Sequence, residues 1–157
     1  MTMSNHNVKV VALGNPAASD DGLALRALER LRARGLPPGV ELISAERDPL
    51  RLVREVGGCE KLVVLDAIYT GASPPGTLHK LRFEGEIQGR PLTLHRLDGL
   101  TALGLALALA EKAPKEVVVI GLEPKDLGPG LSLSPEVERG LDALVEEVLA
   151  EIGRPDG

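Results

Sequence analysis

Apolar runs of strand length alternate along the chain with segments whose apolar residues recur at helical spacing. Mostly apolar runs predict buried strands of a parallel sheet at residues 8–13, 61–65 and 116–120, and residues 40–43 predict a further short strand. Residues 77–83 partly alternate apolar with polar side chains, which predicts a half-exposed strand near the sheet edge. No crossover helix precedes this strand, so we expect it to run antiparallel to its neighbours.

Helical segments follow most of these strands, and their ends carry recognisable residues. Four helices are predicted, over residues 19–34, 49–56, 98–112 and 135–152. Gly35 ends the first, and Ser134 followed by Pro135 is a strong start for the last. No low-complexity tract or internal repeat marks a second domain, so residues 1–157 are expected to form one domain. The predicted fold class is α/β, a three-layer α/β/α sandwich with a mostly parallel five-stranded sheet and one antiparallel strand.

Charge and composition exclude several classes of partner. The net charge of −5 would repel a phosphate backbone, and aromatic residues make up only 1% of the chain, so nucleic acid is not expected. The longest apolar segment, residues 100–110, is far shorter than the roughly 20 residues that span a bilayer, so no membrane association is expected. Scarce Asn and Gln beside abundant Arg, Pro and Glu hint at a thermophilic source.

The single cysteine indicates where the protein works. Cys59 cannot form an internal disulfide, and residues 1–7 lack the cationic start and apolar stretch of a secretory signal. We therefore expect a cytoplasmic protein, present as a monomer or a weak homo-oligomer.

Two aspartates, Asp21 and Asp66, each come just past or at the end of an apolar strand run. The carboxyl ends of parallel strands meet at one sheet edge, where ligands bind, so both carboxylates are expected in one crevice. For Asp20 and Asp21 alone the simpler interpretation is that both cap the helix that starts near Ser19. A phosphate site is excluded, because the segment has no G-x-G-x-x-G and no Gly-Lys-Ser/Thr.

A metal would relieve the repulsion between two close carboxylates. His95 lies between the predicted edge strand and the next helix, so it could reach the same edge. Two carboxylates and an imidazole suit Zn, Ni, Mn or Fe. The other histidines compete poorly, since His6 lies near the terminus and His79 is expected to face solvent from mid-strand. Cys59 is expected to be a small buried filler, and Glu123 either is solvated or borders the cleft.

Four groups of residues follow one another along nearly the whole chain. They are Gly14-Asn15 with Asp20-Asp21-Gly22, Asp66-Ala67 with Gly71 and Pro75-Gly76-Thr77, His95 before an Ala/Leu-rich helix, and Gly121-x-x-Pro124 with Leu133-Ser134-Pro135-x-Val137. In this order they resemble the motifs of the hydrogenase maturation proteases. One segment departs from the family pattern: residues 44–49 are bulky and charged where the family has a glycine-rich turn.

This resemblance implies an endopeptidase that removes a C-terminal extension from the large-subunit precursor of a nickel-iron hydrogenase after nickel insertion. Asp21, Asp66 and His95 would be the metal-contacting set, with Asp21 or Asp66 as the catalytic base. The metal would be nickel delivered by the substrate, while zinc or cadmium could occupy the site in vitro.

Two other enzyme or signalling classes remain open from the sequence. A metallohydrolase with its own zinc would use the same residues. A phosphorylatable receiver module also has an acidic pair and a strand-end aspartate, but six residues separate Leu13 from Asp20, whereas in a receiver the pair follows the strand directly. A binding module without catalysis is the remaining alternative.

Overall fold

A computed structural model describes residues 7–46, 48–84 and 112–153 of the chain. Its five strands are β1 (Val8–Leu13), β2 (Val40–Glu46), β3 (Lys61–Ala67), β4 (Leu78–Glu84) and β5 (Glu116–Leu122). Its helices are the 3₁₀ turn η1 (Ser19–Gly22) and the α-helices α1 (Leu23–Arg34), α2 (Pro49–Val56) and α4 (Pro135–Ile152). The helix predicted over residues 98–112 falls almost wholly outside the described residues. None of the described helices has both the length and the apolarity needed to cross a bilayer.

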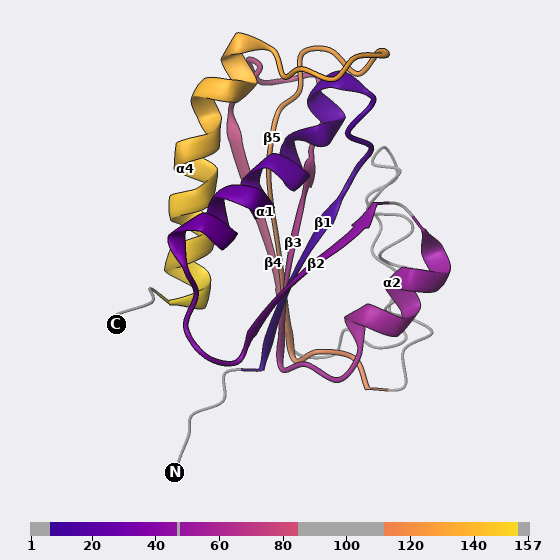
Figure 1. The fold of residues 1–157 in the computed structure, drawn as a ribbon, viewed down its shortest axis with the longest axis vertical. Helices are drawn as coiled ribbons and strands as arrows, with labels where there is room; N and C mark the ends of the chain where they lie inside the picture. The colour runs from indigo at the N-terminus through magenta and orange to yellow at the C-terminus, as the bar shows by residue number, and fades with distance from the viewer. Residues whose placement is uncertain (1–6, 47, 85–111, 154–157) are drawn as a thin grey trace.

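The strands form one sheet in the order β2-β1-β3-β5-β4 (Figure 1). β1 pairs in parallel with β2 and β3, and β3 pairs in parallel with β5. β4 lies at the edge and pairs antiparallel with β5. The predicted α/β class, the mostly parallel sheet and the antiparallel edge strand are therefore confirmed.

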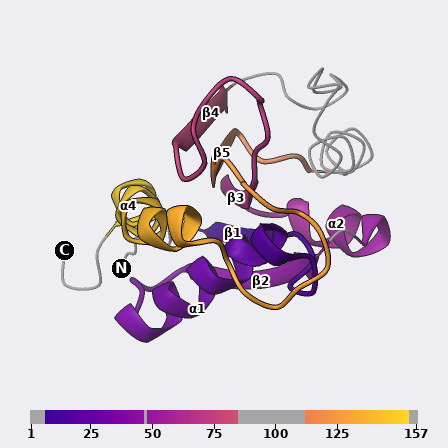
Figure 2. The same ribbon diagram turned by 90° about the horizontal axis from the view of Figure 1, so that it is seen from above.

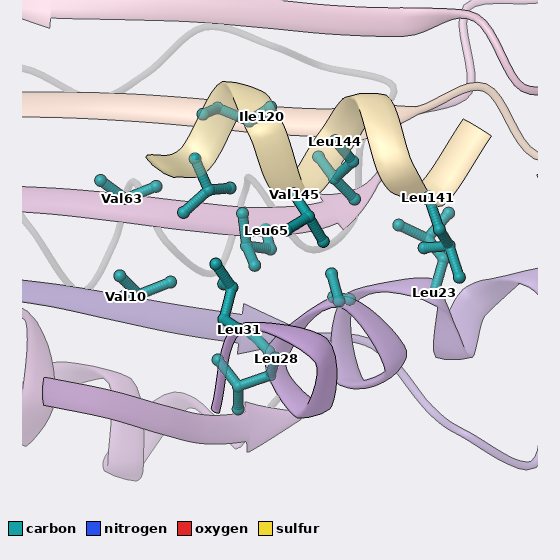
Figure 3. Close-up of a cluster of buried hydrophobic side chains, with 14 of the residues drawn as sticks. Val10, Leu23, Leu28, Leu31, Val63, Leu65, Ile120, Leu141, Leu144 and Val145 are labelled. Atoms are coloured by element: carbon teal, nitrogen blue, oxygen red, sulfur yellow. The ribbon is translucent and has the colours of Figure 1, made fainter. Parts of the chain in front are cut away.

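Helices cover both faces of the sheet, with α1 and α4 on one face and α2 on the other (Figure 2). Successive residues of a strand point to opposite faces of the sheet, as the twofold periodicity of a strand requires. Side chains such as Val10, Val63 and Ile120 pack with α1 and α4 in one aliphatic cluster, drawn in Figure 3. Val11 and Val64, each one residue further on, pack on the side of α2. This arrangement explains why β1, β3 and β5 are apolar over most of their length.

Strand β2 extends beyond its predicted end at Ile43 to Glu46, through most of the segment that departs from the family pattern. Its pairing with β1 shifts register there, since Ala12 lies opposite Ser44 while Leu13 lies opposite Glu46. Ala45, the extra residue, is buried. The hydrophobic run ends at Ile43, so the sequence pattern alone gave no sign of the extension.

Candidate active site

Asp21 and Asp66 both lie at the carboxyl edge of the sheet. Asp21 is in η1, which follows β1, and Asp66 is the penultimate residue of β3. Because β1 and β3 are neighbouring parallel strands, their carboxyl ends meet at the same edge. Both residues are buried, with 3% of Asp21 and 2% of Asp66 exposed. The sequence therefore placed both carboxylates at the correct edge, while their role remains a prediction.

A close backbone approach fixes Asp21 against the end of β1. The backbone N–H of Asn15 donates to Oδ2 of Asp21 at 2.8 Å. Gly14 has a φ of 108°, and a Cβ at this position would lie 2.1 Å from the carbonyl oxygen of Asp21. Only glycine permits this conformation and this approach. The Gly14-Asn15 part of the motif thus holds the main chain that carries Asp21.

Asp66 sits where β3 leaves the sheet. Its Oδ1 accepts a hydrogen bond from the backbone N–H of Ala67 at 2.8 Å, and its partner across the ladder on β5 is Gly121. The side chain is thus oriented by the residue that follows it.

His95, the third residue of the predicted metal set, lies outside the described residues. Within residues 7–46, 48–84 and 112–153, no group of three His, Cys, Asp or Glu side chains is placed to hold a metal ion. The combination of Asp21, Asp66 and His95 as metal ligands therefore stays a prediction.

Asp20 has a different role from the helix cap that the sequence suggested. Its carboxylate accepts hydrogen bonds from the backbone N–H groups of Lys125, Asp126 and Ser134 at 2.8, 2.9 and 2.7 Å, and from the Ser134 hydroxyl at 2.9 Å. Neither η1 nor α1 has a side-chain cap. The capping interpretation was therefore wrong for both aspartates. The Asp20 side chain turns away from its own helix to the connection between β5 and α4, and the Asp21 side chain accepts from Asn15 instead.

The environment of Asp20 favours its charged form. Burial alone would raise the pKa of this carboxyl group, but hydrogen bonds from Asp126, Ser134 and Lys125 outweigh burial and lower the pKa. Asp20 is fully buried. Asp20 is thus a buried anion that joins η1, the turn carrying Asp21, to residues 125–134.

Glu123 forms a second buried anionic cluster at the same edge, which the sequence did not reveal. Its carboxylate accepts from the backbone N–H groups of Thr70 and Gly71 at 2.9 and 3.1 Å and from the Thr70 hydroxyl at 2.7 Å. His79 Nε2 lies 2.7 Å from Glu123 Oε1. Burial would raise the pKa of Glu123, but the hydrogen bonds from Thr70, His79 and Gly71 outweigh burial and lower the pKa.

The prediction that His79 faces solvent was therefore wrong. The register of β4 on β5 places His79 opposite Gly121, two residues before Glu123. The sequence predicted the antiparallel strand but not its register. Only the register brings the side chains of His79 and Glu123 together. Glu123 borders the edge of the sheet as a buried residue, which decides between its two sequence interpretations.

Cys59 is a buried filler, as expected. It is 6% exposed, and burial raises the pKa of its thiol, which disfavours the reactive thiolate. A hollow of about 490 Å³ beside it is lined by residues that include Asn7, Glu60 and Lys115. These residues lie at the amino ends of the strands, opposite Asp21 and Asp66, so this hollow offers none of the predicted chemistry.

Comparison with known proteins agrees with the geometry. The family model for hydrogenase maturation proteases matches residues 25–151. The chain is 30% identical to the hydrogenase 2 maturation protease of Escherichia coli, over 92% of this chain and 90% of that protein. It is also 30% identical to the hydrogenase expression/formation protein HupD of Thiocapsa roseopersicina, over 96% of this chain and 71% of that protein.

Solved structures show the same relationship. The hydrogenase maturating endopeptidase HybD of E. coli superimposes with a TM-score of 0.82 at 26% identity, covering 94% of both chains. The NiFe hydrogenase maturation protease HybD of Thermococcus kodakarensis superimposes with a TM-score of 0.69 at 29% identity, covering 92% of this chain and 98% of that chain. These matches exclude the receiver module. The chain belongs to the hydrogenase maturation protease family, and it is a peptidase.

Proposed function

We propose that this protein removes the C-terminal extension of a nickel-iron hydrogenase large-subunit precursor after nickel has been inserted. We further propose that Asp21, Asp66 and His95 contact that nickel, which arrives as part of the substrate. The names of the relatives support the substrate class, since they are maturation proteases of hydrogenases. The single cysteine supports a reducing, cytoplasmic setting for this reaction.

The observation that carries the proposal is the burial of two carboxylates at one sheet edge. Asp21 and Asp66 reach this edge from neighbouring parallel strands, and both are almost wholly shielded from water. Carboxylate oxygens are suitable ligands for a divalent metal ion, and two of them at one edge can contact the same ion. A nickel centre on the precursor would meet these carboxylates only when the precursor is loaded, which makes the metal a signal of readiness.

The chemistry then needs a base and water. Asp21 or Asp66 would accept a proton from a water molecule while the oxygen of that water attacks the scissile carbonyl carbon. The carbon–nitrogen bond then breaks, and the proton passes to the departing amine. Since Asn15 and Ala67 donate backbone N–H groups to these carboxylates, each base is held in one orientation.

The test is a cleavage assay on a nickel-loaded large-subunit precursor, with loss of the C-terminal extension followed by mass spectrometry. Asp21→Asn, Asp66→Asn and His95→Ala should each lower the rate at least about a hundredfold, the scale of a lost acid–base or metal contact. Asp142→Asn is the matched control, because this carboxylate is 91% exposed on α4. The same substitution there should leave the rate within about twofold. Full cleavage by Asp21→Asn and Asp66→Asn would refute the proposed site.

A further inference from the structure

The side chain of Glu123 holds the start of the connection between β3 and β4, residues 68–77. Its Oε2 accepts from the backbone N–H groups of Thr70 and Gly71, at 2.9 and 3.1 Å. Its Oε1 accepts from the Thr70 hydroxyl at 2.7 Å and lies 2.7 Å from His79 Nε2. An ionised carboxylate can only accept hydrogen bonds, so Nε2 of His79 carries the proton. This carboxylate therefore has four donors, and two of them are backbone N–H groups of the connection.

The main chain of Glu123 holds the end of the same connection. Gly76 N–H donates to the Glu123 carbonyl at 2.7 Å, and Glu123 N–H donates to the Thr77 carbonyl at 2.9 Å. Glu123 thus binds the connection near both of its ends, by its side chain at the start and by its backbone at the finish. Two fixed ends restrict the conformations that the residues between them can adopt.

The segment that Glu123 holds begins directly after Asp66. Ala67 N–H donates to Asp66 Oδ1 at 2.8 Å. The next residue, Ile68, donates its N–H to a carbonyl of β5 at 3.0 Å. Its side chain lies over Gly121, where a Cβ would be 2.8 Å from Ile68 Cγ1, and Gly121 is the residue opposite Asp66 across the ladder. The backbone that orients the Asp66 carboxylate is therefore continuous with the segment that Glu123 holds.

The carboxylate of Glu123 is fully occupied by this task. A carboxylate has about four lone-pair sites, and the four donors take them. The residue is also only 2% exposed. Glu123 is thus unsuited to bind a metal ion or to take a proton from water, whereas its bonds suit it to fix a backbone segment.

We propose that Glu123 is a positioning residue of the candidate active site: it fixes the segment that follows Asp66 and, through that segment, the orientation of the Asp66 carboxylate. The inference rests on the proposed function and adds the residue that keeps Asp66 in place for the chemical step. Groups that act in chemistry must be held within about 0.5 Å, and a misplacement of about 1 Å can cost about a hundredfold in rate. Loss of this hold should therefore lower kcat and leave KM nearly unchanged.

The experiment compares Glu123→Ala with Glu123→Gln on the nickel-loaded precursor, with kcat and KM measured separately. Glu123→Ala removes both acceptor oxygens, so kcat should fall at least about tenfold with KM within about twofold. Glu123→Gln keeps one oxygen for the two backbone N–H groups, and its amide N–H₂ can donate to the Thr70 hydroxyl and to Nε2 of a neutral His79 ring. Its kcat should stay within about threefold of the wild-type value.

Two further variants calibrate this comparison. Asp66→Asn is also a change of carboxylate to amide, yet it should lower the rate at least about a hundredfold, because Asp66 is proposed to react and Glu123 to position. Glu60→Ala is the matched control for Glu123→Ala, since 61% of the Glu60 side chain is exposed and it lies just before β3, at the opposite end of the sheet. Its kcat should stay within about twofold of the wild-type value.

Amide hydrogen exchange measures the hold itself, without the cleavage reaction. The N–H groups of Thr70 and Gly71 donate to a buried carboxylate, so they should be protected in the wild type. Glu123→Ala should speed their exchange at least about tenfold, while Glu123→Gln and Glu60→Ala should leave it nearly unchanged.

The outcomes separate the positioning role from the proposed function. Normal cleavage by the wild type together with an unchanged kcat in Glu123→Ala would overturn the positioning role and leave the proposed function standing. Equal losses of kcat in Glu123→Gln and Glu123→Ala, or a rise in KM alone, would also overturn it. If the wild type cleaves no nickel-loaded precursor, the proposed function fails and the positioning role fails with it, and faster exchange in Glu123→Ala would then report a structural role only.

Thermal melting checks that each variant is folded. If Glu123→Ala unfolds, Thr70→Val replaces it, because this change removes only the hydroxyl donor to Glu123. It should lower kcat about threefold. An unchanged kcat in a folded Thr70→Val would then overturn the positioning role.

Discussion

The adjacent aspartates Asp20 and Asp21 of η1 have different roles. The Asp20 carboxylate accepts four hydrogen bonds from residues 125–134, whereas Asp21 lies beside the ends of β1 and β3. In sequence the two residues look alike, since both stand at the start of a helix behind an apolar strand. The partners of Asp20 lie 105 to 114 positions away, and no local pattern encodes such a contact.

Substituting the two aspartates by asparagine should therefore give opposite results. In Asp20→Asn, an amide N–H₂ would face backbone N–H donors, so a buried site loses acceptors and its charge. We expect a loss of about 2–4 kcal/mol in the free energy of unfolding. In Asp21→Asn, the amide oxygen can still accept from Asn15 N–H, so the fold should be retained while activity is lost.

Urea denaturation of both variants, at neutral pH, measures this difference. Equal stability losses in Asp20→Asn and Asp21→Asn would contradict the division of roles. An Asp20→Asn variant as stable as the wild type would also contradict this division of roles.

At the scale of elements, periodicity and end signals predicted much of the fold. The parallel strands, the antiparallel edge strand and the Ser134–Pro135 start of α4 follow from local patterns, and the structure confirms them. The end of β2 and the pairing of His79 with Glu123 depend on strand register instead. Register is set by contacts between distant segments, which is why the sequence did not show them.

Element contacts also explain how the antiparallel edge strand is attached. Glu151, in the last turn of α4, binds Lys61 of β3 at 2.7 Å and also pairs with Lys80 and Arg82 of β4. Burial would raise the pKa of Glu151, but the hydrogen bonds from Arg82, Lys61 and Lys80 outweigh it and lower the pKa to about 2. One carboxylate thus ties α4 to the edge of the sheet.

This cluster predicts a particular acid sensitivity. The folded-state pKa of Glu151 is depressed from 4.5 to about 2. The contribution of Glu151 to the free energy of unfolding is therefore fully present above pH 4.5 and is lost as the pH falls toward 2. Glu151→Gln should therefore cost at most about 3 kcal/mol at pH 7, and its stability should converge on that of the wild type near pH 2.

Chemical denaturation across this pH range is the measurement. Glu147→Gln is the matched control, since Glu147 reaches Lys80 only at 3.5 Å with 31% of its side chain exposed, and it should change stability little. A stability difference for Glu151→Gln that stays constant from pH 7 to pH 2 would rule out the ionised cluster.

At the scale of the whole molecule, the two ends of the sheet are specialised. The amino end holds Cys59 and paired charges such as Lys115 with Glu60, which lie 3.5 Å apart. The carboxyl end gathers the buried carboxylates Asp20, Asp21, Asp66 and Glu123. Glu123 orders the connection that follows β3, and Asp20 orders the connection that follows β5. The other two are proposed to meet the substrate's nickel, so binding and cleavage would share one edge.

The dependence of cleavage on nickel tests this account most directly. The same large-subunit precursor is prepared with and without nickel, incubated with the wild-type protein purified without added metal, and analysed by mass spectrometry. We predict that the nickel-loaded precursor loses its C-terminal extension while the nickel-free precursor stays intact. Equal cleavage of both forms would contradict the account, because the carboxylates would then have no substrate metal to recognise.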